Sequence, residues 1–234
     1  MRRKGRPGLH GRSASQNRDR AGAFRRNATS DRSYEPPARK PKLTVRPLTP
    51  ARWSDLEALF GAKGCSVARH CWCMFYRRSG PPERLPKGMN RAQANRAALK
   101  SLVDSGTSPG LIGYRGRTPV GWISLGPREH YAKLARSPVM KAVDGAPVWS
   151  IVCFVVPREH RGQGIAHALL QGAVAYARKH GARLLEAYPV DKAAHGNDDA
   201  MWFGAKSMFD AAGFAEVARR KPQRPVVRLR TQQE

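Results

Sequence analysis

A run of glycines and arginines near the middle of the chain has the spacing of a phosphate-binding turn. The run Arg161-Gly162-Gln163-Gly164-Ile165-Ala166 follows a strongly apolar segment and precedes apolar residues at helical spacing. A glycine turn between a buried strand and a helix presents free backbone N–H groups at the positive end of the helix dipole, where they bind phosphate. A simple connector is the alternative, although two alternating glycines flanked by arginines exceed what a turn requires.

The segments around this turn are predicted to form a strand, a helix and a second strand. Val148–Val156 is almost entirely apolar, as in a strand buried on both faces, and Pro157 ends it. Apolar residues then recur at helical spacing through Ala177, Lys179 and His180 fall in the last turn, and Gly181 is the expected C-cap. The second strand is predicted over Arg183–Tyr188. The turn therefore connects the first strand to the N-terminus of the helix, and the second strand follows the helix.

The rest of the chain predicts a mixed α/β domain with hairpins at both ends, not a doubly wound parallel sheet. Alternating and helical apolar patterns identify the other elements. The predicted strands are Leu43–Leu48, Leu111–Tyr114, Val120–Leu125, Phe214–Arg219 and Val226–Leu229. The predicted helices are one capped by Thr49 or Ser54, one near Asn90–Ser105 and one near Met201–Ala212.

The composition is strongly basic. The 234 residues include 43 Lys and Arg against 17 Asp and Glu, which gives a net charge of +26. Such a charge favours polyanionic partners or a phosphate-rich cofactor, although a solvated basic surface has the same composition. Residues 1–42 are predicted to be a disordered basic tail, which either contacts nucleic acid nonspecifically or is a bare linker. The globular domain is predicted over residues 43–234.

The four cysteines, Cys65, Cys71, Cys73 and Cys153, are too few for a disulfide scaffold of this length. Zinc sites take four ligands in spaced pairs, whereas three of these cysteines and His70 crowd one short stretch, so we predict no metal.

No apolar run is long enough to span a bilayer, and the arginine-rich N-terminus lacks the apolar core of a secretory signal. We therefore expect a cytoplasmic protein without membrane contact.

The central unit resembles the GCN5-related N-acetyltransferase (GNAT) family. The family signature, Gln/Arg-x-x-Gly-x-Gly/Ala, stands here as Arg161-Gly162-Gln163-Gly164-Ile165-Ala166, and the last predicted helix ends in Ala212-Gly213-Phe214, as the family's closing helix commonly does. The similarity covers roughly Leu43 to Leu229. It implies a six- to seven-stranded mixed sheet, splayed between the fourth and fifth strands and flanked by helices.

The resemblance also implies a co-substrate, acetyl-CoA, lying in the splay. Its pyrophosphate would rest on backbone N–H groups of the glycine turn, and its pantetheine arm would pair with the fourth strand. The residues implied to bind it are Phe154, Val155, Val156, Arg161, Gly162, Gln163, Gly164, Ile165, Ala166 and His167. A backbone N–H near Phe154 or Val155 would be the oxyanion donor.

The side chains available for proton transfer depart from the family's pattern. Ser150 stands where many members have a glutamate base, and Phe209 stands where they have a tyrosine acid. We therefore name Ser150, Glu186 and Tyr188 as candidate catalytic residues, with Ser207 as a further substitute. Glu186 would serve equally as a surface charge, and Tyr188 as a core aromatic.

The segment from Cys71 to Arg77 occupies the region that forms the acceptor wall in the family. Rings and hydroxyls of Trp72, Tyr76, Trp122 and Tyr131 would face a small substrate there, unless Trp72 and Phe75 are ordinary core residues. The resemblance implies an N-acetyltransferase that acts by direct transfer on an amine of a small molecule, a protein or an aminoacyl group. The alternative is a weak or inactive GNAT-fold module that binds acyl-CoA or nucleic acid.

Overall fold

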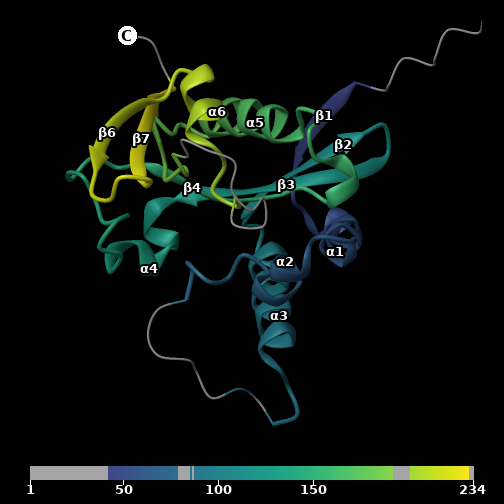
Figure 1. Ribbon diagram of the computed structural model, residues 1–234. Helices are drawn as coiled ribbons and strands as arrows, with labels where there is room; N and C mark the ends of the chain where they lie inside the picture. The colour runs from purple at the N-terminus through teal and green to yellow at the C-terminus, as the bar shows by residue number, and fades with distance from the viewer. Residues whose placement is uncertain (1–41, 79–84, 86, 192–200, 232–234) are drawn as a thin grey trace, which may run out of the picture. The chain divides into compact units, whose positions relative to one another are not determined.

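The computed structural model describes residues 42–78, 85, 87–191 and 201–231, all within the unit Lys40–Glu234 (Figure 1). Its strands are β1 Leu43–Pro47, β2 Gly110–Arg115, β3 Thr118–Pro127, β4 Trp149–Val155, β5 Leu184–Ala187, β6 Ala215–Arg219 and β7 Pro225–Arg230. They form one seven-stranded sheet in the order β1-β2-β3-β4-β5-β7-β6, in which only β4 and β5 run parallel. The predicted mixed sheet is confirmed. The predicted tail and its nucleic-acid contact lie outside the described residues, apart from Lys42.

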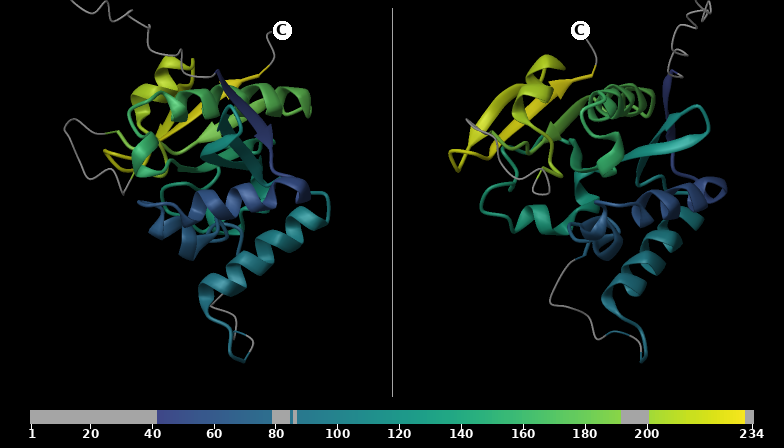
Figure 2. Two further views of the ribbon diagram at one scale, coloured as in Figure 1. Left: turned by 90° about the vertical axis from the view of Figure 1, so that its right-hand side faces the viewer. Right: turned by 45° about the vertical axis from the view of Figure 1, so that its right-hand side comes forward.

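Helices cover both faces of the sheet (Figures 1 and 2). They are α1 Trp53–Gly61, α2 Ser66–Cys71, α3 Arg91–Asp104, α4 Ala132–Ala135, α5 Ile165–Lys179 and α6 Lys206–Ala211. The last helix begins later than Met201, where the sequence pattern placed it. Ala205 forms a β-bridge with Val190, and the Val190 amide donates to Gly204 O over 2.9 Å, so this stretch stays extended.

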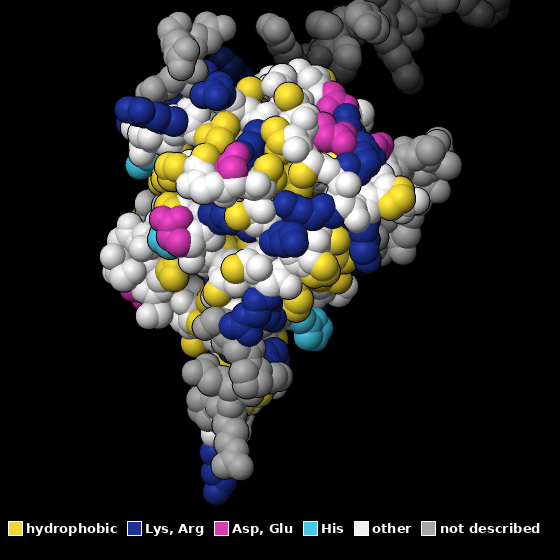
Figure 3. Space-filling model, turned by 90° about the vertical axis from the view of Figure 1, so that its left-hand side faces the viewer, with side chains coloured by type: hydrophobic (Ala, Val, Ile, Leu, Met, Phe, Trp, Pro, Cys, Tyr) yellow, Lys and Arg dark blue, Asp and Glu magenta, His cyan; other side chains and the backbone are white. Residues whose placement is uncertain are grey.

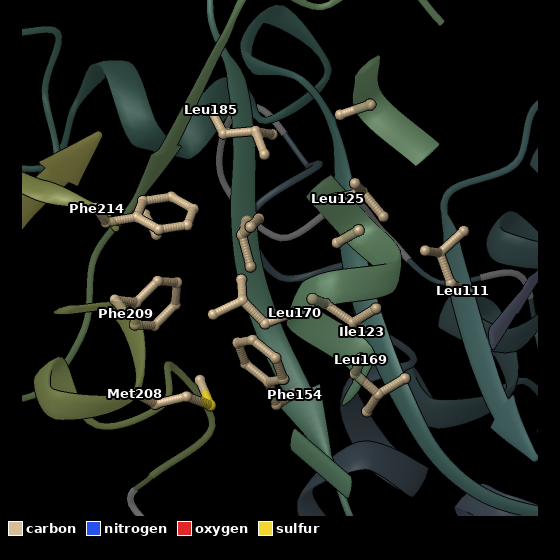
Figure 4. Packing of buried hydrophobic residues seen from close by; sticks show 14 of the residues in the cluster. Leu111, Ile123, Leu125, Phe154, Leu169, Leu170, Leu185, Met208, Phe209 and Phe214 are labelled. Atoms are coloured by element: carbon tan, nitrogen blue, oxygen red, sulfur yellow. The ribbon is translucent and has the colours of Figure 1, made fainter. Parts of the chain in front are cut away.

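Neighbouring strand residues point to opposite faces and divide the core into two layers. Leu111 and Ile123 pack with α5 and α6, in the cluster that Figure 4 shows around Leu169 and Phe209. Their neighbours Ile112 and Trp122 pack instead with α1, α2 and α3. The sheet is therefore buried on both faces across β2 and β3, as the apolar strand sequences require.

Two glycines allow α5 to lie unusually close to the sheet. A Cβ at Gly121 in β3 would come within 2.7 Å of Ile165 Cγ2. A Cβ at Gly172 in α5 would come within 2.6 Å of Val45 Cγ1. Real Cβ atoms do not approach so closely, so only glycine lets the helix settle here. This contact fixes the position of the helix N-terminus beside β4.

The two parallel strands separate soon after they meet. β4 and β5 pair only at Trp149 with Leu185, Ser150 with Glu186, and Ile151 with Ala187. Beyond Ile151, β4 continues to Val155 without β5 beside it. Trp202, which follows β5 in the chain, reaches over this part of β4 and accepts a hydrogen bond of 2.6 Å from the Phe154 amide. The predicted splay between the fourth and fifth strands is thus present.

The face shown in Figure 3 carries Lys and Arg side chains spread among apolar groups, while Asp and Glu form a few small groups. This agrees with the basic composition of the chain. Within the described ranges, no helix combines the length and the apolar character needed to cross a membrane.

An ion network is buried at the closed end of the splay, where β4 and β5 still pair. Glu186 is fully buried, and its carboxylate accepts hydrogen bonds of 2.8 Å from Arg128 Nη1 and from Arg228 Nε. The Tyr188 hydroxyl donates to the same carboxylate over 2.7 Å, and Ser150 Oγ lies 3.0 Å from that hydroxyl. Burial is the main cause that raises the pKa of Tyr188, and the charge of Glu186 raises it further. The Tyr188 hydroxyl therefore keeps its proton and donates the hydrogen bond.

Replacing Glu186 by alanine should lower the free energy of unfolding by roughly 3–5 kcal/mol, because two guanidinium groups lose a shared buried partner. Urea unfolding followed by circular dichroism measures this loss. The matched control is Glu216→Ala, which removes one of two carboxylate partners of Arg219 at the surface and should cost about 0–1 kcal/mol. Equal losses in the two variants would contradict a stabilising role for the buried network.

Candidate active site

A cavity of about 740 Å³ follows the part of β4 that has separated from β5. One wall is the strand itself, from Val152 to Val156, and one end is the N-terminus of α5. The opposite wall comes from α2 and the turn after it, and the segment around Trp202 closes a further side. The cavity therefore lies where the sequence predicted the splay to hold a ligand.

The glycine turn forms an open cradle at the N-terminus of α5. Gly162 and Gly164 adopt positive φ angles of 69° and 74°, which glycine reaches without strain. The first helical hydrogen bond is donated by Ala168 to Gly164 O, so the amides before Ala168 have no acceptor within the helix. A Cβ at either glycine would meet no atom within 4 Å, so the space before these amides is open to an anion.

Nine of the ten residues predicted to bind acetyl-CoA line the cavity, and Gln163 does not. The Gln163 side chain instead accepts a 2.5 Å hydrogen bond from Arg115 in β2 and donates one of 2.7 Å to Glu159 O. It therefore anchors the turn to the sheet. Arg161 lines the cavity and also donates to Val156 O over 3.2 Å, which ties the turn to the end of the strand.

The predicted oxyanion donor needs one correction. The Phe154 amide donates to Trp202 O, so it is already engaged in this arrangement. Sequence patterns do not reveal such a contact, because Trp202 and Phe154 lie far apart in the chain. A role for the neighbouring Val155 amide stays a prediction.

The candidate catalytic residues Ser150, Glu186 and Tyr188 do come together, but within the buried ion network. None of the three lines the cavity, and all are almost completely buried. Ser207, by contrast, does line the cavity. The geometry thus gives the three residues a clear structural role at the closed end of the splay.

The predicted acceptor wall contains both cavity and core residues. Tyr76 lines the cavity, and burial raises its pKa to about 12, so its hydroxyl carries a proton at neutral pH. The other three predicted side chains, Trp72, Trp122 and Tyr131, are buried and do not line it. Phe75 lines the cavity and is 53% exposed, which makes it a surface residue rather than core.

All four cysteines of the chain line this cavity. Sequence reasoning placed Cys71 and Cys73 in the acceptor wall but missed Cys153, which resembles one more apolar residue of a buried strand. Its position three residues before Val156, at the middle of the splayed strand, is the signal that would have found it. In the described part of the chain, no group of three or more His, Cys, Asp or Glu side chains is arranged to hold a metal ion.

Comparison with solved structures finds many similar chains, among them the following three acetyltransferases. An acetyltransferase from Thermus thermophilus is 18% identical, with a TM-score of 0.45 over 81% of this chain and 97% of that one. A Drosophila melanogaster polyamine N-acetyltransferase is 14% identical, with a TM-score of 0.46 over 81% and 100%. A mosquito arylalkylamine N-acetyltransferase-like protein is 10% identical, with a TM-score of 0.49 over 81% and 100%.

No curated protein sequence matches the chain. The model of the acetyltransferase (GNAT) family does match it, over residues 71–203, which is more than half of its length. The match includes the splayed strand, the glycine turn, α5 and the cysteine-containing segment before them. The chain therefore belongs to the GNAT family of acetyltransferases and is an acyltransferase.

Proposed function

We propose that this protein transfers an acetyl group from acetyl-CoA to an amine. The observation that carries the proposal is the continuity of the cradle at Gly162 and Gly164 with the cavity along the splayed strand. The cradle offers backbone N–H groups to the pyrophosphate, and the cavity gives the pantetheine arm an extended path along β4. Acetyl-CoA would supply the activated acetyl thioester.

A cavity of about 740 Å³ has room for both the thioester end of the donor and a small acceptor. Direct transfer between the two bound substrates is the simplest route, since holding the amine beside the carbonyl carbon supplies much of the rate by itself. The negative charge that develops on the carbonyl oxygen needs a donor, and the leaving thiolate needs a proton. Tyr76 lines the cavity, and its hydroxyl would provide that proton.

The acceptor side of the cavity favours an amine that carries an apolar group. Val67, Phe75 and Trp202 line it while remaining 57%, 53% and 38% exposed. Among the described lining residues there is no carboxylate, and Lys133 Nζ lies 3.8 Å from the Phe75 ring centroid. Apolar walls beside a cation disfavour an ammonium group and favour the neutral amine that attacks.

Binding and turnover are tested separately. Acetyl-CoA should raise the thermal unfolding temperature of the protein, and CoA should be released when an amine from a suitable panel is added. Release of CoA would be followed with a thiol reagent, and the acetylated amine identified by mass spectrometry. Failure to bind acetyl-CoA would overturn the donor assignment, whereas binding without turnover of any amine would overturn the transferase assignment.

Replacing Gly164 by alanine should weaken acetyl-CoA binding by roughly tenfold or more, since a Cβ enters the cradle and the backbone is strained at positive φ. Isothermal titration calorimetry measures the dissociation constant. Gly181→Ala is the matched control, because Gly181 has a φ of 76° at the opposite end of the same helix. Both variants should lose stability, but only Gly164→Ala should lose affinity, and equal affinities would contradict the cradle.

A monoamine with an aromatic ring, such as phenethylamine, should be acetylated with a kcat/KM roughly 10–100-fold above that of spermidine, since burying one ring contributes about 1.5–3 kcal/mol. Phe75→Ala and Trp202→Ala should each reduce this preference. Val217→Ala, at an exposed apolar residue of β6 outside the cavity, should leave it unchanged. A preference for spermidine in the unmodified protein would refute the apolar acceptor.

Tyr76→Phe should lower kcat by roughly 10²–10⁴-fold, the usual contribution of a general acid, while acetyl-CoA affinity stays unchanged. Steady-state kinetics with calorimetric binding separates the two effects. Tyr176→Phe removes a hydroxyl outside the cavity and serves as the control. A kcat within twofold of the unmodified value would exclude proton donation by Tyr76.

A further inference from the structure

The residue between the two glycines of the cradle is held by two hydrogen bonds of its side chain. Gln163 Oε1 accepts a hydrogen bond of 2.5 Å from Arg115 Nη1, and Gln163 Nε2 donates one of 2.7 Å to Glu159 O. Both ends of the carboxamide are therefore engaged, one by strand β2 and one by the backbone just before the turn. Because Gln163 stands between Gly162 and Gly164, these contacts act on the cradle itself.

The cradle needs such an anchor because glycine does little to fix its own conformation. Both of its glycines have positive φ angles, and glycine populates other backbone conformations about as readily. Holding the turn in one conformation therefore costs conformational entropy. A side chain that is held between the glycines restricts the turn before any ligand arrives. A site arranged in advance binds its ligand more tightly, since less of the binding free energy is lost to ordering.

Arg115 gives this anchor a rigid end. It is the last residue of β2, and it pairs with Leu43 in β1 and with Thr118 in β3, so strands on both sides fix its backbone. Helix α5 packs closely against the same strand, because a Cβ at Gly113 in β2 would come within 3.2 Å of Leu169 Cδ2. This packing brings the turn that precedes α5 within reach of the arginine.

The other side-chain contacts of the turn hold its beginning. Arg161 Nε donates to Val156 O over 3.2 Å, and Arg161 Nη2 donates to Gly64 O over 3.3 Å. Arg161 precedes Gly162, so these bonds fix the entry to the cradle and not the stretch between its glycines. The bond from β2 is the contact that ties this stretch to the sheet.

Arg115 and Gln163 support the site without forming its wall. Neither side chain lines the cavity. Arg115 Nε is buried and has no hydrogen-bond partner among the described residues, which is a cost to stability. The guanidinium is therefore placed for its bond to the turn and not for a complete set of hydrogen bonds of its own.

We propose that Arg115 is a positioning residue for the CoA donor and acts through Gln163, by holding the cradle in its phosphate-binding conformation. The proposal rests on the proposed use of acetyl-CoA and adds a determinant of donor affinity that lies in a strand outside the cavity. Because the pair holds only the cradle, its loss should affect ligands that carry a pyrophosphate. The chemical step should keep its rate once the donor is bound.

Isothermal titration calorimetry measures the dissociation constant of acetyl-CoA for the unmodified chain, Gln163→Ala, Arg115→Ala and the double variant. Each single substitution should weaken binding by roughly tenfold, as the loss of one hydrogen bond to a charged group does. The double variant should lose no more than either single variant, because the two residues act as one unit. The matched control is Arg117→Ala, which removes the same charge from an exposed position in the turn between β2 and β3 and should change affinity by less than about twofold.

A second measurement distinguishes positioning of the cradle from damage to the whole site. S-acetylpantetheine carries the acetyl thioester and the pantetheine arm but has no pyrophosphate. With an amine that the unmodified protein acetylates, kcat/KM for acetyl-CoA should fall by roughly tenfold in both single variants. The kcat at saturating acetyl-CoA and the kcat/KM for S-acetylpantetheine should stay unchanged. Equal losses with the two donors would overturn the proposal.

The outcomes also separate this proposal from the proposed function. Unchanged acetyl-CoA affinity in Gln163→Ala would overturn the positioning role alone. Additive losses in the double variant would do the same, since Arg115 would then act through its charge and not through Gln163. If the unmodified protein fails to bind acetyl-CoA, the donor assignment is wrong and this proposal is lost with it. Gln163→Ala removes a partly exposed side chain from a turn, so it tests the proposal even if Arg115→Ala fails to fold.

Discussion

The functional half of this molecule depends on the early separation of its two parallel strands. Only three residue pairs join β4 to β5, and beyond Ile151 the edge of β4 that faced β5 borders a cavity, while its other edge still pairs with β3. A strand edge buried without a partner would leave amide groups unsatisfied. Trp202 satisfies one of them, at Phe154. The rest of this edge lines the cavity, which extends to the N-terminus of α5. Gly121 and Gly172 hold that helix close enough for the two features to form one site.

The closed end of the splay needs its own stabilisation because the strand pairing there is so short. Glu186 supplies it by joining Arg128, which follows β3, to Arg228 in β7, across the whole width of β4 and β5. In other proteins, replacing a buried ion network by apolar side chains is often energetically neutral. Here the fixed geometry of a carboxylate between two guanidiniums also fixes where the strands meet, and hence where they part. The polar residues of the closed end therefore shape the cavity without lining it.

Sequence reasoning predicted the central unit well because its signals are local. Pro157, the paired glycines and the helical spacing through Ala177 act within a few residues of where they occur. The ion network escaped this reasoning, since Glu186 and its arginine partners are brought together only by the sheet order. The left-handed turn at Trp72 and Cys73 also escaped it, because neither residue type favours positive φ. Tertiary contacts with Trp122 stabilise that turn, and no short-range pattern encodes them.

The cost of removing a charged group from water explains why thiols, and not carboxylates, line the cavity wall. A carboxylate beside Phe75 and Trp202 would have to be desolvated or neutralised, at a cost that an apolar acceptor pocket does not offset. A neutral thiol is buried like a small apolar group, so four of them line this cavity with little penalty. The indole of Trp122 also donates a hydrogen bond of 3.2 Å to the Cys73 sulfur, so this buried thiol has a polar partner. The wall can thus remain apolar where Phe75 and Trp202 line the cavity.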